Sequence, residues 1–239
     1  MNTNHEKVAL VTGANRGIGK EISKQLCQQG YAVFMASRDI EKGRQAVQEL
    51  CEQGFEAILL PMDVTDPVSI KNACGSFSQK ADHLDVLINN AAILEEADRH
   101  VSIQKLSIES LERTLRVNLM GPIMIIQDFL PFLEKSKLGA RIINMTSDLG
   151  SLNHMQDSYP AYSLSKTALN AMTRQFSAAL AGKNIAVSCV NPGWVQTSMG
   201  GPNANRPVEK GAETAVWLAL EAPLRETGKF WKDKREVPW

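Results

Sequence analysis

The sequence has few of the residues that build metal centres or disulfide frameworks. It contains 4 cysteines and 4 histidines in 239 residues, without a C-x-x-C pair or an H-x-x-H or H-E-x-x-H pattern. Scattered cysteines are typical of reduced structural thiols, and a zinc site needs ligands at short spacing. We therefore expect no metal site. The cysteines are Cys27, Cys51, Cys74 and Cys189.

An excess of one charge is also missing, because 26 Lys and Arg residues balance 26 Asp and Glu residues. Such a chain has no general attraction for nucleic acid or an anionic membrane, so we expect neither as a partner. The most apolar run, residues 117–133, is interrupted by Asn118, Gln127 and Asp128, which excludes a clean membrane span. The polar start does not resemble a signal peptide, and we expect a cytoplasmic protein.

No Pro/Ser-rich linker divides the chain, and strand and helix patterns alternate along it. This alternation is typical of a mostly parallel sheet with right-handed crossovers and helices on both faces. We predict one α/β domain over residues 1–239 with a seven-stranded sheet. The predicted strands are residues 7–12, 31–36, 56–61, 84–89, 140–145, 185–190 and 229–232, and the predicted helices are 17–29, 40–53, 66–79, 108–133, 159–181 and 208–220.

A glycine-rich turn, Thr12-Gly-Ala-Asn-Arg-Gly-Ile-Gly19, connects the first predicted strand to the first helix. Gly13 permits a tight turn, Gly17 lets the backbone approach a diphosphate, and Gly19 allows close packing of helix and strand. The spacing G-x-x-x-G-x-G differs from the G-x-G-x-x-G fingerprint. Its position between a strand and a helix nevertheless predicts a dinucleotide site.

Tyr162 and Lys166 are four residues apart on a predicted helix, so their side chains share a helix face. A cation about 4 Å from a phenol contributes on the order of 4 kcal/mol at an effective dielectric of about 20, enough to lower the phenol pKa by about three units. We therefore expect Lys166 to lower the pKa of Tyr162. Tyr159 has the uncharged Ser163 at the same spacing, so Tyr162 is the better candidate for acid catalysis.

The turn and the Tyr-Lys pair together resemble the short-chain dehydrogenase/reductase superfamily, and the resemblance covers nearly the whole chain. Three further motifs match in order: Asn89-Asn-Ala-Ala92, where the family has a final glycine; Asn118 in V-N-L-M-G; and Ser147 after a strand. Pro192-Gly-Trp-Val-Gln-Thr-Ser-Met199 and the segment 228–239 resemble the carbonyl reductases within the superfamily. Those monomeric relatives carry a long insertion ahead of the tyrosine that this chain lacks.

The resemblance implies a Rossmann fold and four catalytic residues. Tyr162 is the expected general acid in reduction, Ser147 orients the carbonyl, and Lys166 binds the nicotinamide ribose. Asn118 is expected to complete a proton relay through water. The expected cofactor contacts are Gly13, Asn15, Arg16, Gly17, Ile18, Gly19, Ser37, Arg38, Asp63, Val64, Asn90, Ala91, Tyr162, Lys166, Pro192, Gly193, Val195 and Thr197.

The end of the second strand decides between the two nicotinamide cofactors. A carboxylate there suits the ribose of NAD, whereas a 2′-phosphate needs cations. Arg38 follows this strand and Arg16 lies in the glycine turn, and two guanidinium groups suit a phosphate. Asp39 is the competing carboxylate, but an N-cap position explains it as well. We predict NADP(H).

The segment 198–206 is rich in Gly, Pro and Asn, which indicates a short, mobile substrate lid. Leu149, His154, Met155 and Trp194 are the predicted pocket residues. They suggest a small-molecule substrate with an aromatic or bulky carbonyl group.

Two alternatives stay open beside a reductase of ketones, aldehydes or quinones. A 3-oxoacyl thioester reductase shares the same core residues, although the segment 228–239 lacks the Asp-Gly-Gly ending common in those enzymes. A catalytically inactive NADP-binding regulator is the other, and retention of Tyr162 and Lys166 argues against it. Relatives often pair through the long helices expected at 108–133 and 159–181, which suggests a homodimer or homotetramer.

Overall fold

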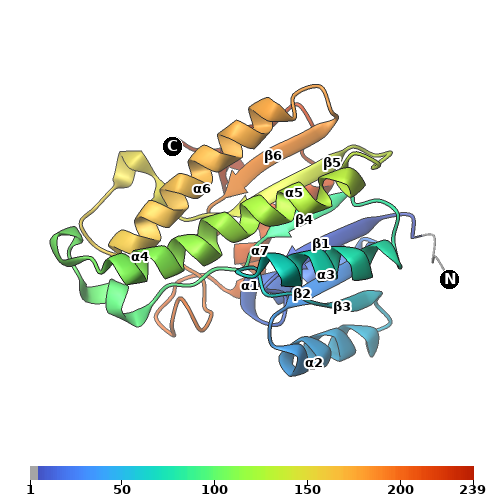
Figure 1. Ribbon diagram of the computed structural model, residues 1–239, viewed down its shortest axis with the longest axis horizontal. Coiled ribbons are helices and arrows are strands. Elements are labelled where there is room, and N and C mark those ends of the chain that lie inside the picture. The colour runs from blue at the N-terminus through green and yellow to red at the C-terminus, as the bar shows by residue number, and fades with distance from the viewer. Residues whose placement is uncertain (1–4) are drawn as a thin grey trace.

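A computed structural model describes residues 5–239 and has a single twisted sheet at its centre (Figure 1). The strand order is β3-β2-β1-β4-β5-β6-β7-β8, and every neighbouring pair is parallel except β7 with β8. The predicted mostly parallel α/β fold is confirmed. The strands are β1 (Val8–Thr12), β2 (Ala32–Ser37), β3 (Ala57–Pro61), β4 (Val86–Asn89), β5 (Ala140–Met145), β6 (Ile185–Val190), β7 (Phe230–Lys232) and β8 (Arg235–Glu236).

Helices cover both faces of the sheet, and each face has its own apolar cluster. On one face α1, α2 and α7 contribute residues such as Ile22, Leu50 and Ala215. On the other, which is the near face in Figure 1, α3, α5 and α6 contribute residues such as Phe77 and Phe129. The helices are α1 (Gly17–Gln28), α2 (Ile40–Cys51), α3 (Pro67–Ser78), α4 (Ile108–Leu115), α5 (Gly121–Leu133), α6 (Pro160–Ala179) and α7 (Val208–Leu220), with short helices η1 (Glu96–His100), η2 (Ile103–Lys105), η3 (Arg116–Met120), η4 (Asp148–Gly150) and η5 (Leu152–His154).

The sheet has eight strands, one more than predicted. The additional strand β8 turns back on β7 through Asp233 and Lys234, whose φ angles are 50° and 59°. Two successive residues at positive φ make the two-residue turn that suits a hairpin, but Gly or Asn usually fills such positions. Because a lysine is atypical in such a turn, the sequence pattern did not predict this hairpin.

The helix predicted over residues 108–133 is formed, with an irregularity in its middle. Between α4 and α5 the segment η3 is a π-helix, in which the Gly121 N–H donates to the Arg116 carbonyl. Such a turn inserts an extra residue into the helix and is frequent at functional sites. Asn118, one of the predicted catalytic residues, lies inside it.

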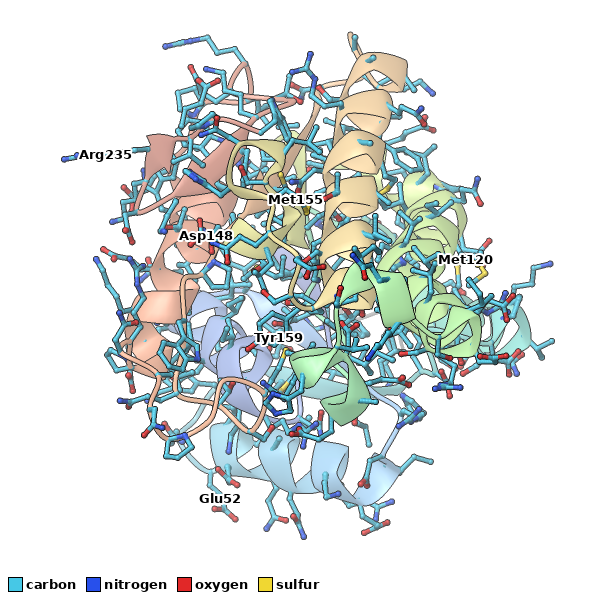
Figure 2. All side chains as sticks on the ribbon, turned by 90° about the vertical axis from the view of Figure 1, so that its left-hand side faces the viewer. Glu52, Met120, Asp148, Met155, Tyr159 and Arg235 are labelled. Atoms are coloured by element: carbon cyan, nitrogen blue, oxygen red, sulfur yellow. The ribbon has the colours of Figure 1, made fainter. Side chains whose placement is uncertain are left out.

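The carboxyl ends of the parallel strands meet at one edge of the sheet, where ligands bind in open α/β folds. This edge faces the viewer in Figure 2, in which Tyr159 lies near the centre and Asp148 and Met155 lie above it. The predicted site residues follow β1 through β6 or lie on helices beside this edge. No helix within residues 5–239 is long and apolar enough to cross a membrane.

Candidate active site

The glycine turn has the geometry that a bound diphosphate needs. Gly13 and Gly17 have φ angles of 62° and 54°, which side chains rarely allow. Arg16 is the N-cap residue of α1 and is exposed, and its own side chain makes no capping hydrogen bond. The backbone N–H groups of the first turn are therefore available to an anion. Asn15 and Ile18 are half-buried in the same turn.

The Asn90 side chain holds the glycine turn by hydrogen bonds to its backbone. Its amide nitrogen donates to the Thr12 carbonyl at 2.8 Å and to the Gly13 carbonyl at 3.2 Å. The Thr12 hydroxyl in return accepts from the backbone N–H groups of Asn90 and Ala91, both at 3.0 Å. A Cβ on Gly19 would lie 2.5 Å from the Gly13 carbonyl oxygen, so this position has no room for a side chain. The side chain of Asn90 thus holds the turn rather than facing a ligand, and Thr12 is a support residue that the motif search missed.

Ser147, Tyr162 and Lys166 come together at the ends of β5 and α6. Ser147 follows β5, and its side chain is hydrogen-bonded to Tyr162. The Lys166 Nζ lies 5.5 Å from the centre of the Tyr162 ring and donates to the Met145 carbonyl at 2.7 Å. Both helix residues are buried, at 8% and 2% exposure. The expected adjacency of amine and phenol is present.

The prediction that Lys166 lowers the pKa of Tyr162 is wrong for the protein without a ligand. Burial raises the pKa of Tyr162 to about 12, and the hydrogen bond with Ser147 opposes this rise only in part. Burial also lowers the pKa of Lys166 to about 7, so the amine is only partly charged near neutral pH. Desolvation of both groups outweighs the attraction that the i, i+4 spacing suggests. Tyr162 is consequently protonated at pH 7.

Asn118 connects the catalytic helix to the loop after β4. Its amide oxygen accepts from the Ile93 N–H at 2.9 Å, and its nitrogen donates to the Ile93 carbonyl and the Ser165 hydroxyl, both at 3.0 Å. Both ends of the side chain are therefore occupied by protein groups. The proton relay through Asn118 stays a prediction.

Arg38 and Asp39, the two candidates for contact with the cofactor ribose, follow β2 and have different partners. Asp39 is the N-cap of α2, where its side chain accepts from the Lys42 N–H at 3.1 Å, and it is ion-paired with Lys42. Arg38 is 77% exposed, and its guanidinium lies 4.0 Å from Asp63. The Asp39 side chain caps α2, whereas the Arg38 side chain is accessible.

Two other predicted cofactor contacts near this strand end have partners within the protein. The Ser37 hydroxyl donates to the Asp39 carbonyl, and Val64 packs on the core beside α5.

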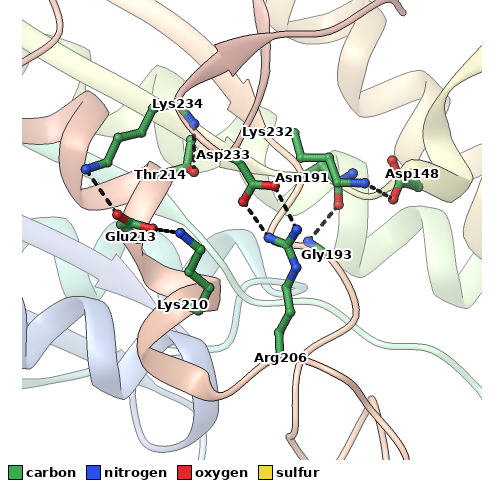
Figure 3. Close-up of polar contacts among 10 residues, drawn as sticks. All are labelled: Asp148, Asn191, Gly193, Arg206, Lys210, Glu213, Thr214, Lys232, Asp233 and Lys234. Carbon is green, nitrogen blue, oxygen red and sulfur yellow. Dashed lines mark hydrogen bonds and ion pairs between the residues drawn. The ribbon is translucent and has the colours of Figure 1, made fainter.

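The loop after β6 is held by a group of polar contacts (Figure 3). A Cβ on Gly193 would lie 2.5 Å from the Arg206 Nε, so this guanidinium packs directly against Gly193, one of the predicted cofactor contacts together with Pro192. Arg206 donates two hydrogen bonds to Asp233, at 2.6 and 2.7 Å, and Lys232 is ion-paired with Asp148 at 2.7 Å. The turn between β7 and β8 thereby fixes the loops that follow β5 and β6.

Thr197 and Val195, two other predicted cofactor contacts in this loop, differ in their surroundings. A Cβ on Gly17 would lie 3.2 Å from the Thr197 methyl group, which places Thr197 directly beside the glycine turn. Val195 is 3% exposed and packs against Gly211 of α7, so its side chain belongs to the core.

The four predicted pocket residues surround the same edge at different depths. Leu149 is half-buried next to Ser147, and its N–H donates to the serine hydroxyl at 3.2 Å. His154 is exposed, Met155 is 40% exposed, and Trp194 is 54% exposed. The Trp194 indole donates to the Gly200 carbonyl at 2.8 Å and so contacts the predicted lid.

Sequence reasoning missed Asp98, a buried carboxylate in the loop after β4. Its two oxygens accept from the backbone N–H groups of Ala161 and Tyr162, each at 2.9 Å. The residue belongs to no motif and lies 63 positions before Ala161. No local signal could have found it, because the contact exists only after the chain folds.

Comparison with known proteins gives a consistent set of relatives. Residues 7–207 match the family described as short chain dehydrogenase. Carbonyl reductase [NADPH] 1 of Sus scrofa is 31% identical over 280 aligned positions, which cover 99% of this chain and 96% of that protein. The NADPH-bound carbonyl reductase from chicken fatty liver is 28% identical, with a TM-score of 0.88 over 98% of this chain and 99% of that chain. Carbonyl reductase Sniffer of D. melanogaster is 29% identical with the same TM-score and coverage.

The family match, the strand order and the Ser147, Tyr162 and Lys166 arrangement all agree with one another. The chain belongs to the short chain dehydrogenase family.

Proposed function

We propose that this protein is an NADPH-dependent reductase that converts a ketone, aldehyde or quinone carbonyl to an alcohol. The observation that carries the proposal is the contact of the Ser147 hydroxyl with the Tyr162 phenol at the sheet edge that also carries the glycine turn. The carbonyl reductases of pig and chicken, whose names include NADPH, support the choice of chemistry.

In the proposed reaction two hydroxyl groups act on one carbonyl oxygen. NADPH, when bound, supplies the hydride that adds to the carbonyl carbon. Tyr162 gives its proton to the oxygen, and Ser147 donates a hydrogen bond to it as negative charge develops there. Since burial raises the pKa of Tyr162 to about 12, the phenol keeps its proton at neutral pH and is in the form that reduction requires.

Lys166 stabilises the tyrosine after the proton has left. Its pKa of about 7 lets the amine take up a proton near neutral pH, when negative charge appears on the neighbouring phenol. The hydrogen bond to the Met145 carbonyl fixes the amine against the end of β5. In this proposal the same amine also binds the ribose hydroxyls of the cofactor.

Residues around the glycine turn fit a dinucleotide with a 2′-phosphate. The N-terminus of α1 suits the diphosphate, and the exposed Arg38 and Arg16 suit the additional phosphate. Asp39, which would favour NADH, is used as the N-cap of α2.

Exposed apolar side chains near the catalytic groups support an apolar or aromatic substrate. Leu152, Met155 and Trp194 are 67%, 40% and 54% exposed and lie in the loops after β5 and β6. An apolar ring or chain packed against them would lose contact with water, which favours binding. The segment 198–206 lies in the loop that contains Trp194 and acts as the lid of this pocket.

The test is NADPH oxidation by the purified protein with two groups of substrates. We expect turnover with aromatic ketones, aldehydes and quinones, and little with 3-oxoacyl thioesters. Faster turnover with the thioesters would favour the fatty-acid reductase alternative. NADPH binding without turnover of either group would instead favour a regulator.

A further inference from the structure

The N-terminus of α6, the helix that carries Tyr162 and Lys166, has no cap of its own. Its N-cap residue is Tyr159, whose side chain makes no capping bond and whose φ and ψ angles of 55° and 48° are left-handed. N-caps are normally Ser, Thr, Asp or Asn in an extended conformation. Pro160 follows and has no N–H, so Ala161 and Tyr162 contribute the first donors that need an acceptor.

Asp98 on η1 supplies both acceptors from a distant part of the chain. One carboxylate oxygen accepts from the Ala161 N–H and the other from the Tyr162 N–H, each at 2.9 Å. Asp98 is 2% exposed and forms no ion pair within residues 5–239, where the ion pairs of η1 join Arg99 and His100 to Glu96. A carboxylate at a helix N-terminus makes charge-assisted bonds and interacts favourably with the helix dipole.

The same short helix also contacts the predicted lid. Arg99, the neighbour of Asp98, donates from its Nη2 to the Met199 carbonyl at 2.7 Å. Adjacent residues of η1 therefore connect to the catalytic helix on one side and to the segment 198–206 on the other. Asp98 lies at the junction of these two parts of the site.

We propose that Asp98 is a positioning residue for the acid Tyr162, an inference that rests on the proposed function. Its carboxylate bonds the backbone of Tyr162 itself and holds the first turn of α6 with the left-handed Tyr159 in place. The phenol is thereby kept in register with Ser147. Lys166 lies a turn further along and is anchored separately through the Met145 carbonyl.

This difference in anchoring predicts which kinetic constant changes. Loss of the Asp98 carboxylate loosens the first turn of α6 and misplaces the phenol, whereas the glycine turn and Lys166 keep their own supports. A displacement of about 1 Å at a reacting group can reduce a rate by roughly 100-fold. We therefore expect kcat to fall and NADPH affinity to be preserved.

The experiment compares Asp98→Asn and Asp98→Ala with the wild-type enzyme in NADPH-dependent carbonyl reduction. Asparagine keeps one acceptor and places an N–H₂ against the other backbone donor, so kcat per NADPH-binding site should fall about 10-fold, and about 100-fold for alanine. The Kd for NADPH should stay within about twofold of the wild-type value. Asp157→Asn is the matched control, because that exposed carboxylate also joins two loops, through Ser102 and Ile103, but does not touch α6.

The outcomes separate this inference from the proposed function. A purely structural role would lower the melting temperature and the fraction of protein that binds NADPH, and leave kcat per binding site unchanged. That result with Asp98→Asn would overturn the inference even if Asp98→Ala fails to fold. A wild-type protein without carbonyl turnover would overturn the proposed function and this inference with it.

Discussion

Replacing Gly19 by alanine tests whether the glycine turn is shaped for a dinucleotide. The new Cβ would lie 2.5 Å from the Gly13 carbonyl oxygen, a backbone atom that can move only with the turn. Overpacking of this kind costs about 1–3 kcal/mol. The new Cβ would also displace the Asn90 amide and so weaken its hydrogen bonds to the Thr12 and Gly13 carbonyls. Each of these bonds contributes about 0.5–1.5 kcal/mol to the stability of the turn.

We expect the free protein to relieve this clash by shifting the turn, so that most of the loss appears as weaker cofactor binding. A loss of about 2–3 kcal/mol corresponds to a rise of roughly 30- to 150-fold in the Kd for NADPH. Titration of NADPH fluorescence measures it, and urea unfolding measures the stability.

Gly75→Ala is the matched control for Gly19→Ala, because a Cβ on Gly75 in α3 meets nothing within 4 Å. This variant should bind NADPH normally and gain up to about 1 kcal/mol of stability from helix propensity. The reasoning is refuted if Gly19→Ala binds NADPH within about threefold of the wild type and unfolds at the same urea concentration.

Arg38→Asp should shift cofactor preference from NADPH toward NADH, measured as the ratio of kcat/KM values, and an unchanged ratio would contradict the assignment. Because burial lowers the pKa of Lys166 to about 7, the amine is mostly uncharged at pH 8, and an anionic dinucleotide should raise its pKa and draw in a proton. Calorimetry in buffers of different ionisation enthalpy should detect this uptake in the wild type and not in Lys166→Met. Phe77→Ala should lower the free energy of unfolding by about 3–5 kcal/mol, because Phe77 is fully buried between Phe34 and Phe129, and a loss under about 1 kcal/mol would refute its place in the core.

The sheet and the positions of the site residues could be predicted because parallel strands buried on both faces appear as apolar runs. β1 and β6 are buried at every position, and the residues after them must lie at the same edge of the sheet. Gly13, Ser147 and Gly193 follow β1, β5 and β6, so their order along the chain predicted their position at this edge. The hairpin at Asp233 and Lys234 was missed because its turn uses residues that seldom adopt positive φ.

Two properties of the site could not be predicted, because they depend on tertiary burial. The spacing of Tyr162 and Lys166 indicated their adjacency, but the pKa directions of both groups follow from the removal of water around them. The cap that Asp98 provides for α6 joins segments 63 residues apart and has no counterpart in local sequence. Helix-capping rules applied to Tyr159 and Pro160 alone would find no acceptor.

In the proposed reaction Tyr162 delivers the proton during carbonyl reduction. The most direct test of this role is a single turnover with NADPH deuterated at the transferring position, in which deuterium in the alcohol product is measured by mass spectrometry. We expect Tyr162→Phe to bind NADPH normally but to transfer deuterium at least about 100-fold more slowly, whereas Tyr159→Phe should transfer it at close to the wild-type rate. Equal transfer rates in the wild type and Tyr162→Phe would contradict this role.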